Sequence, residues 1–208
     1  MNKVTSIMSM QIANFRAVNT FMNADKVEGK DTFRVTKDPK VKAVDEATFA
    51  RLVEADFKNG IIEVKVLSRL LADAPEFARG FIGIAFRINA SNSRFECIYL
   101  RPTSGRAEDQ LRRNRSTQYF SYPDFKFDRL RAESPGKYES YADMGLGEWI
   151  NMKIEVREEK AKLYLNESEN PVLIVNDLKH GATTSGGIGL WVDIGTEGYF
   201  ADLRVDNT

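Results

Sequence analysis

Residues 149–156 read Trp-Ile-Asn-Met-Lys-Ile-Glu-Val, so apolar and polar side chains alternate along the chain. This period of two is typical of a β-strand with one buried and one solvated face. Residues 62–66, Ile-Glu-Val-Lys-Val, follow the turn signal Asn59-Gly60 and repeat the pattern. Further short strands are predicted at residues 32–36, 80–88, 95–101, 161–165, 172–175, 187–192 and 199–205. Many short strands without βαβ spacing indicate an all-β sandwich or barrel.

The chain has 208 residues, of which 42% are hydrophobic, so it can bury one substantial core. Residues 31–208 are predicted to form a single sandwich domain. Residues 1–30 are polar and aperiodic, with Phe15 and Phe21 as large apolar anchors, and are predicted to form an N-terminal arm. Asp45–Ala55 and Arg106–Arg115 have the residue types of short helices, which would not change the fold class.

Charge gives no indication of a polymer partner. Thirty basic residues balance thirty acidic ones, whereas nucleic acid or an anionic membrane surface would require a basic surplus. No segment is long and apolar enough to be predicted to enter a bilayer, and the N-terminus lacks the apolar stretch of a signal peptide. The chain is therefore expected to be cytoplasmic or a processed mature form, and its oligomeric state is left open.

Familiar catalytic and metal motifs are not predicted. Cys97 is the only cysteine and lies in an apolar strand, which indicates an inert buried thiol. His180 is the only histidine, in a turn expected to be exposed, so no transition-metal site is predicted. No cofactor is expected. Calcium is left open, because sandwiches of this type often fix loops with carboxylates, although no ligand spacing identifies a site. No Gly-x-Ser-x-Gly elbow is present, and Glu54-Ala55-Asp56 is not followed by the second Glu of the laminarinase pattern Glu-x-Asp-x-x-Glu.

Residues 101–142 form a long segment that mixes arginines with aromatic residues. It is too long for a turn and too aromatic for a solvated linker, which favours a functional or packed segment. Aromatic rings can contact the C–H faces of a sugar while Arg, Glu and Gln hydrogen-bond its hydroxyls. A saccharide ligand is therefore the first hypothesis. The alternative is a non-enzymatic protein-interaction module that uses segment 101–142 as its contact surface.

The C-terminal half carries a resemblance to known proteins. Residues 149–156, 161–165, 175–178, 187–191 and 199–205 resemble the closing strands of the laminin G-like and concanavalin A-like superfamily. This resemblance implies a two-sheet antiparallel jelly-roll sandwich. Residues 95–101, followed by Glu108-Asp109-Gln110-Leu111, resemble the bacterial 3-keto-disaccharide hydrolase family, in which a strand ending in Arg precedes a Glu-x-Gln motif.

The second resemblance implies that Arg101, Glu108 and Gln110 are pocket residues and that Trp191 lies on the concave face. Members of that family carry Asp-His-Gly after the Trp191 strand, where this chain has Asp193-Ile194-Gly195. A histidine that could act as base or ligand is therefore missing.

Strand alternation adds two residues to this site. Tyr99 and Arg101 fall on one face of their strand, and Arg87 is expected on the same face of the neighbouring strand. The predicted saccharide-binding residues are Arg87, Tyr99, Arg101, Gln110 and Trp191, and the predicted catalytic residue is Glu108. The sequence thus indicates a carbohydrate-binding protein or a glycoside hydrolase candidate with a concave-face pocket, and leaves open whether it is catalytic.

Overall fold

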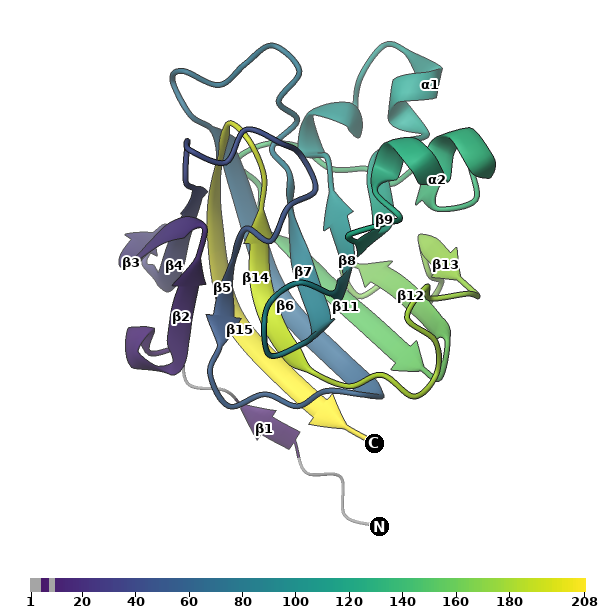
Figure 1. The fold of residues 1–208 in the computed structure, drawn as a ribbon. Coiled ribbons are helices and arrows are strands. Elements are labelled where there is room, and N and C mark those ends of the chain that lie inside the picture. Colours follow the sequence, from purple (N-terminus) through teal and green to yellow (C-terminus); the bar gives the residue numbers. More distant parts are fainter. Residues whose placement is uncertain (1–4, 8–9) are drawn as a thin grey trace.

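A computed structural model describes residues 5–7 and 10–208. Strands dominate the chain, and helix is confined to short turns (Figure 1). The first strands are β1 (Thr5–Ile7), β2 (Phe15–Val18), β3 (Thr20–Val27), β4 (Lys30–Lys37), β5 (Phe49–Leu52), β6 (Gly60–Leu70), β7 (Ile82–Ile88) and β8 (Phe95–Leu100). The later strands are β9 (Thr117–Tyr122), β10 (Glu139–Ser140), β11 (Ile150–Arg157), β12 (Lys160–Leu165), β13 (Leu173–Val175), β14 (Gly187–Val192) and β15 (Thr196–Asn207). The helices are α1 (Gln110–Arg113) and α2 (Phe127–Glu133), with 3-10 turns η1 (Ile12–Asn14) and η2 (Pro102–Ser104).

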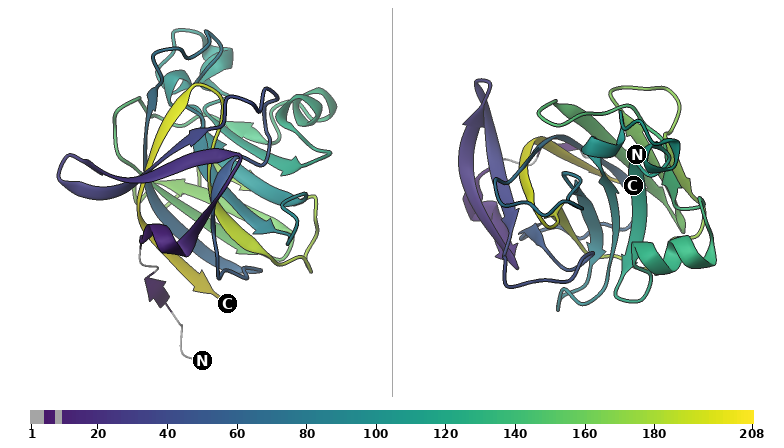
Figure 2. Two further views of the ribbon diagram at one scale, coloured as in Figure 1. Left: turned by 60° about the vertical axis from the view of Figure 1, so that its left-hand side comes forward. Right: turned by 90° about the horizontal axis from the view of Figure 1, so that it is seen from above.

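The strands form two antiparallel sheets packed face to face (Figure 2). The first sheet has the order β13-β12-β11-β6-β15-β4-β3, with β1 paired to β15. The second sheet has the order β10-β9-β8-β7-β14-β5-β2. The prediction of an all-β, two-sheet antiparallel sandwich is confirmed.

The two sheets differ in how their outer faces are covered. In the first sheet β11 alternates buried and half-buried positions, so its outer face meets solvent. In the second sheet every residue of β7, β8 and β14 is buried. One face of these strands enters the inter-sheet core through Ile84, Ile98 and Leu190, which are paired across the sheet. The opposite face must therefore also be covered by protein.

Aromatic side chains occupy that outer face of the second sheet. Tyr99, Phe120 and Trp191 pack together, with 4.8 Å between the ring centroids of Tyr99 and Trp191. Gly83 pairs with both Tyr99 and Trp191 in the ladder, and a Cβ there would lie 2.5 Å from the Tyr99 Cα. Glycine at residue 83 thus lets the two rings meet across β7.

A segment between β4 and β5 covers these rings, and we call residues 38–48 the strap. The Trp191 Nε1 donates a hydrogen bond of 2.9 Å to the Glu46 carbonyl oxygen of the strap. Asp193 fixes the same segment, because its carboxylate accepts from Lys37 Nζ at 2.6 Å and from the Asp45 backbone N at 2.8 Å. The strap therefore closes the outer face around Trp191.

The helix expected over Asp45–Ala55 is wrong. The first part of this stretch belongs to the strap, and Phe49–Leu52 form β5, which pairs with β14 on one side and β2 on the other. Sheet pairing of buried side chains has overridden helix propensity here. The expected turn of helix within Arg106–Arg115 is present as α1.

The predicted N-terminal arm, residues 1–30, contains three paired strands within its described part, of which β1 pairs with β15. β2 forms an edge of the second sheet and β3 an edge of the first. The boundary expected at residue 30 falls in the β3–β4 hairpin, whose turn residues Glu28 and Gly29 have φ of 51° and 77°. The division into arm and domain remains a prediction, and residues 1–4 and 8–9 lie outside the described residues.

Arg87 does not lie beside Tyr99 as expected. The β7–β14 pairing shifts register between Gly187 and Gly189, and Arg87 has a φ of 53°, so strict alternation fails at this bulge. The fully buried Arg87 guanidinium instead donates to the carbonyl oxygens of Lys58, Gly181 and Glu158 at 2.7–3.0 Å. Because the carbonyls of Lys58 and Glu158 flank β6 and β11, Arg87 connects the second sheet to the first.

We expect Arg87→Met to lower the free energy of unfolding by at least ~3 kcal/mol, since three carbonyl oxygens would lose their donor at about 1–3 kcal/mol each. Urea unfolding measures this loss. Arg157→Met, at an exposed position on β11, is the matched control and should change stability little. A loss below about 1 kcal/mol for Arg87→Met would contradict this structural role.

Candidate functional site

A pocket of about 570 Å³ is lined by residues of the strap, α1, α2 and the second sheet. We call it the arginine pocket, because five arginines line it. Its lining residues are Val44, Asp45, Phe77, Arg79, Phe81, Tyr99, Arg101, Ser104, Asp109, Leu111, Arg112, Arg115, Phe127, Arg131 and Asp193. The segment 101–142 supplies more than half of them, so the long insertion between β8 and β11 builds most of the pocket.

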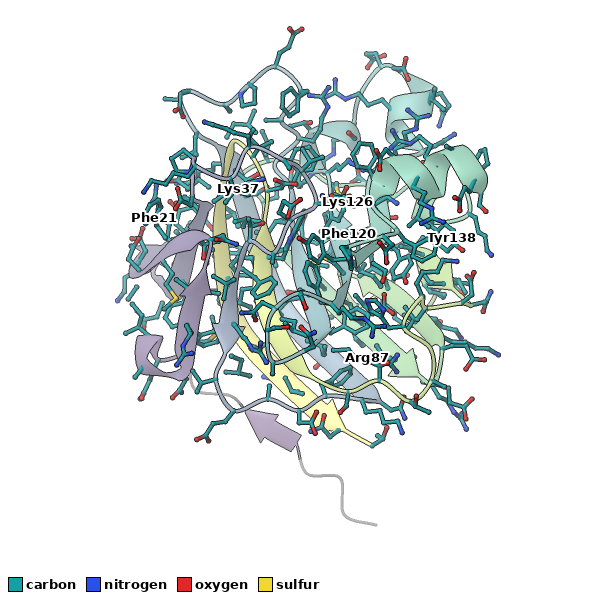
Figure 3. The ribbon with its side chains drawn as sticks, viewed as in Figure 1. Phe21, Lys37, Arg87, Phe120, Lys126 and Tyr138 are labelled. Carbon is teal, nitrogen blue, oxygen red and sulfur yellow. The ribbon has the colours of Figure 1, made fainter. Side chains whose placement is uncertain are left out.

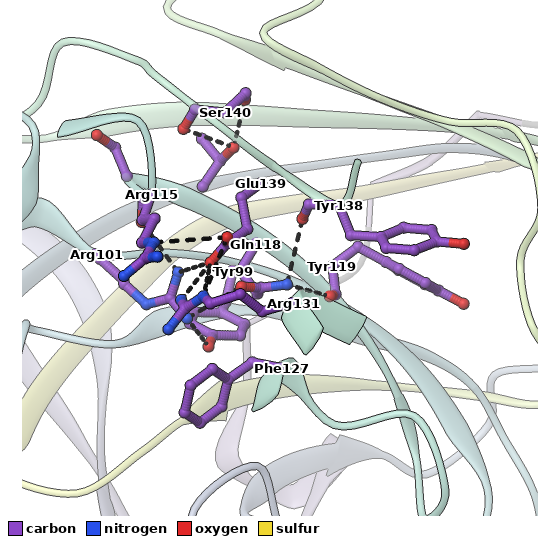
Figure 4. A network of polar contacts seen from close by, with 12 residues as sticks. Tyr99, Arg101, Arg115, Gln118, Tyr119, Phe127, Arg131, Tyr138, Glu139 and Ser140 are labelled. Atoms are coloured by element: carbon purple, nitrogen blue, oxygen red, sulfur yellow. Dashed lines mark hydrogen bonds and ion pairs between the residues drawn. The ribbon is translucent and has the colours of Figure 1, made fainter. Parts of the chain in front are cut away.

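Arg101 stands at the base of the pocket with only 6% of its surface exposed (Figure 4). Its Nη2 donates to the Tyr99 hydroxyl at 2.7 Å and to the Gln118 Oε1 at 3.1 Å, and its Nη1 donates to the Arg115 carbonyl oxygen at 2.9 Å. The guanidinium also lies over the rings of Tyr99 and Phe127, at 4.9 and 5.6 Å from their centroids. These contacts fix its orientation before any ligand arrives.

The carboxylate of Glu139 lies within ion-pair distance of three of the arginines. It accepts hydrogen bonds from the Arg131 Nε and Nη2, and lies 3.6 Å from Arg101 Nη1 and 3.7 Å from Arg115 Nε. One negative charge therefore faces three positive charges in this cluster (Figure 4). The cluster keeps an excess of positive charge.

The side chains of Arg79 and Arg112 donate hydrogen bonds to uncharged oxygen atoms of the protein. Arg79 Nη1 donates to the carbonyl oxygens of Glu76 and Ala78, and Arg112 Nη2 donates to the Thr103 carbonyl and hydroxyl oxygens. Among the described residues neither guanidinium has a carboxylate within 4.0 Å, and the buried Arg112 Nε has no hydrogen-bond partner. Burial and the neighbouring charges of Arg112 and Arg101 lower the pKa of Arg79.

The pocket also contains an unusual carboxyl group. Asp45 is almost fully buried, its Oδ2 accepts from the Phe127 backbone N at 2.8 Å, and its own N–H is bound to Asp193. Burial, followed by the charge of Asp193, raises the pKa of Asp45 to about 7. Asp45 thus retains its proton in weakly acidic solution, unlike an ordinary aspartate.

Two of the predicted site residues line the pocket, namely Tyr99 and Arg101. Trp191 is on the same face, next to Tyr99, but it is fully buried beneath the strap and has no ring face free for a sugar. Arg87 lies elsewhere, well below Lys126 in Figure 3, with its donors occupied by backbone.

Glu108 and Gln110 are exposed and do not line the pocket, although Asp109, Leu111 and Arg112 do. Helix α1 begins at Gln110, so successive side chains rotate around the helix axis, and Gln110 Nε2 instead bonds to Asn114 Oδ1 at 2.8 Å. The catalytic role predicted for Glu108 and the binding role predicted for Gln110 stay predictions without support from pocket geometry.

Sequence reasoning missed four pocket residues that now stand out: Asp45, Arg79, Arg112 and Phe127. Arg112 and Phe127 belong to the segment singled out for its arginines and aromatics. Asp45 and Arg79 lie in connections between strands, where side-chain direction follows no period.

A second hollow of about 420 Å³ lies on the outer face of the first sheet. It is lined by Glu63, Val64, Lys65, Asn151, Met152, Lys153, Tyr164, Glu167, Ser168, Asp202 and Arg204. Its ion pair Lys65–Asp202 spans 2.7 Å but is more than one third exposed, and Lys153 lies over the Tyr164 ring. Solvated, mutually paired groups of this kind are weaker anchors than the buried guanidinium of Arg101.

His180 was expected to be an exposed turn residue, but both nitrogens of its ring have polar partners. Its Nε2 lies 3.0 Å from both the Ser121 Oγ and the Tyr122 carbonyl oxygen, and its Nδ1 lies 3.1 Å from Arg94 Nη2. Arg94 can only donate, so Nδ1 must accept and Nε2 carries the proton in the neutral ring. That tautomer cannot take a proton from Ser121, so the pair lacks the arrangement of a serine hydrolase.

Cys97 is fully buried, and burial raises the pKa of its thiol well above the usual range, in keeping with the inert residue expected. Over residues 5–7 and 10–208, no three or more His, Cys, Asp or Glu side chains gather into a potential metal-ion cluster. In the same residues no helix is long and apolar enough to cross a membrane.

No family model matches the chain, and no curated protein matches it. Solved structures do match it. The carbohydrate-binding module CBM66 from Bacillus subtilis aligns with 92% of this chain and 95% of its own, at 12% identity and a TM-score of 0.56. A glycosyl hydrolase candidate from Parabacteroides distasonis aligns with 94% of this chain and 89% of its own, at 11% identity and a TM-score of 0.54.

A protein of unknown function with a galectin-like fold, also from Bacillus subtilis, aligns with 97% of this chain and 92% of its own, at 12% identity and a TM-score of 0.52. At these identities the likeness shows the fold alone. The chain thus has a galectin-like sandwich fold, which agrees with the jelly-roll sandwich that the first resemblance implied. Membership of the laminin G-like and concanavalin A-like superfamily stays a prediction. Membership of the 3-keto-disaccharide hydrolase family stays a prediction.

The raised pKa of Asp45 generates a prediction about stability and pH. In the unfolded chain Asp45 ionises near pH 3.8, whereas in the folded chain it keeps its proton to about pH 7. Its contribution to stability is therefore fully present below pH 4 and is lost as the pH rises to 7, by up to ~1.4 kcal/mol per pH unit. Asparagine mimics the protonated side chain and also tolerates the φ of 52° at this position.

We expect Asp45→Asn to stabilise the protein progressively more, relative to the unmodified chain, between pH 5 and pH 7, and by a constant amount above pH 8. Urea unfolding at several pH values measures this difference. Asp124→Asn, at an exposed turn position, serves as the control and should show no such trend. A stability difference for Asp45→Asn that does not change with pH would contradict the assignment.

Proposed function

We propose that the protein binds a saccharide in the arginine pocket. The main observation in support is the fixed guanidinium of Arg101, which lies at the base of a pocket of about 570 Å³. Stacking on Tyr99 and Phe127 and three hydrogen-bond acceptors hold this planar group in place. Three of its five N–H donors are used by these acceptors, which leaves the others for sugar oxygens, and pre-organisation reduces the entropy lost on binding.

The pocket rim supplies apolar surface for the C–H face of a sugar ring. Phe77 and Leu111 are 52% and 58% exposed, although both are large apolar residues. Phe81 is half-buried between this rim and Tyr99. A polar base with an apolar rim is the usual composition of a small-molecule site.

The similar solved structures support this proposal at the level of fold. One of them is a carbohydrate-binding module, and another is a glycosyl hydrolase candidate, and both align over most of this chain. Because one fold hosts many functions, this is an argument by analogy that adds to the pocket chemistry.

Hydrolysis is the second candidate function, and Asp45 is the residue that favours it. A carboxyl that keeps its proton near neutral pH is suited to protonate a leaving-group oxygen, as the general acid of a glycosidase does. Asp193, the neighbouring carboxylate, is engaged by Lys37 and the strap and is poorly placed to act as a free base. We therefore propose saccharide binding as the primary function, with Asp45 rather than Glu108 as the acid if the saccharide is turned over.

The alternative hypothesis, a protein-interaction module based on segment 101–142, has less support. Of its seven aromatic side chains, Tyr119, Phe120 and Tyr138 are buried and a further three are half-buried. Leu111 and Tyr141 are the large apolar side chains of the segment that remain well exposed among the described residues. They do not form a broad apolar surface by themselves.

Glycan-array screening followed by calorimetry tests the proposal. We expect Arg101→Ala to weaken binding of a glycan hit by about 1.5–3 kcal/mol, the scale of a hydrogen bond to a charged group. Glu108→Gln should leave the affinity unchanged, and so should Arg113→Ala, because Arg113 lies on α1 outside the pocket. If Arg101→Ala leaves the affinity unchanged and Lys153→Ala, in the second hollow, lowers it, the binding site lies on the other sheet.

Product analysis with each glycan hit tests for turnover. We expect Asp45→Asn to abolish any turnover, because it removes the proposed acid.

A further inference from the structure

The arginine pocket has a specific charge imbalance. Its five arginines face Asp45, Asp109 and Asp193 in the lining, and Glu139 just behind it. Asp193 is neutralised by Lys37 at 2.6 Å, and Asp109 caps α1 by accepting from the Arg112 backbone N at 2.7 Å. Asp45 is protonated for part of the physiological pH range. The carboxylates therefore do not balance the guanidinium groups.

The imbalance is concentrated at Arg79 and Arg112. Both side chains are half-buried, and their hydrogen bonds to protein are to carbonyl and hydroxyl oxygens. The Arg112 Nε is buried without a hydrogen-bond partner among the described residues. A half-buried cation without an anionic partner leaves its charge uncompensated, which costs free energy. A carboxylate provides the acceptor that a guanidinium binds best, often through two parallel hydrogen bonds.

Arg79 and Arg112 are linked to each other through Thr103 and lie close to the apolar rim of the pocket. The Thr103 backbone N donates to the Arg79 carbonyl oxygen at 3.2 Å, and Thr103 in turn accepts from the Arg112 side chain. The rim residue Leu111 precedes Arg112 on α1, and Phe77 lies two residues before Arg79. Each unpaired guanidinium is thus near an exposed apolar side chain.

We propose that the arginine pocket selects acidic saccharides, with the sugar carboxylate bound by Arg79 and Arg112 and the ring against the Phe77–Leu111 rim. This inference rests on the proposed saccharide-binding function and deepens it by naming the ligand class. A neutral sugar would leave the two cations without an anionic partner, whereas a uronate would supply one through its carboxylate. The sugar carboxylate is therefore the group by which the pocket would distinguish acidic from neutral saccharides.

The test uses uronic acid oligosaccharides and their methyl esters, which share a skeleton but differ in charge. Oligomers of galacturonate, glucuronate and mannuronate are titrated into the full-length protein by calorimetry at low and moderate salt. At least one acid should bind tenfold or more tightly than its methyl ester, and the difference should shrink as salt rises. Acetate and sulfate are titrated alone as anion controls and should bind far more weakly than the acidic sugar.

Arg112→Gln removes the charge while keeping a side chain that can donate to Thr103. We expect it to lose at least tenfold affinity for the acid and to lower the affinity for the methyl ester by a much smaller factor, with partial recovery of acid binding in Arg112→Lys. Arg113→Gln, on the same helix but outside the pocket, is the matched control and should change neither affinity. Arg79→Gln provides an independent variant at the second guanidinium.

The outcomes separate the two proposals. Equal binding of acid and ester would overturn selection for acidic sugars while leaving saccharide binding intact. Binding of acetate or sulfate as tight as that of the acidic sugar would show a simple anion site and would also overturn it. Binding of no saccharide, acidic or neutral, in this panel and on the glycan array would overturn the proposed function itself.

Discussion

The buried carboxylate of Asp193 is the constraint on which the site depends. It accepts from Lys37 Nζ at 2.6 Å, from the Asp45 backbone N at 2.8 Å and from the Ile194 backbone N at 2.7 Å. Both side chains of the ion pair are less than 5% exposed, so removing one partner would leave an uncompensated buried charge, which typically costs about 3–5 kcal/mol. The pair fixes the start of the strap and the position of Asp45 together.

Once the strap is fixed, the outer face of the second sheet is closed. Glu46 accepts the hydrogen bond of the Trp191 indole, and its carboxylate accepts from the Tyr122 hydroxyl and from Lys126. The aromatic layer of Tyr99, Phe120 and Trp191 becomes a third layer of core outside the sandwich itself. The remaining opening lies at the end of this layer, where segment 101–142 adds its arginines.

Strand periodicity predicted most of the sandwich because apolar and polar residues alternate in strands such as β6 and β11. It also placed Tyr99 and Arg101 together, since Arg101 directly follows the last residue of β8. Edge strand β3 escaped prediction because six of its eight residues are exposed or half-buried, which leaves little apolar pattern to read. Arg87 was misplaced for a different reason, namely the bulge that breaks alternation within β7.

Motif resemblance pointed to the segment that builds most of the pocket, and of the residues it implied there, Arg101 lines the pocket whereas Glu108 and Gln110 do not. Glu108 and Gln110 belong to the turn that leads into α1, and the helix presents Leu111 and Arg112 to the pocket instead. Arg79 and Asp45 contribute from connections that lie about 20 and 55 residues before Arg101, and such convergence depends on tertiary structure. Asp45 carries no sequence signal for its raised pKa, because burial and Asp193 produce it only in the folded chain.

Hydrogen exchange of the Trp191 indole N–H, followed by nuclear magnetic resonance, tests the central claim most directly. If the strap closes the outer face, this proton exchanges as slowly as the most protected backbone amides of β14, because it is buried and bonded to Glu46. Exchange near the rate of a solvent-exposed indole would show that the strap is open in solution. The outer face, rather than the arginine pocket alone, would then be available to a ligand.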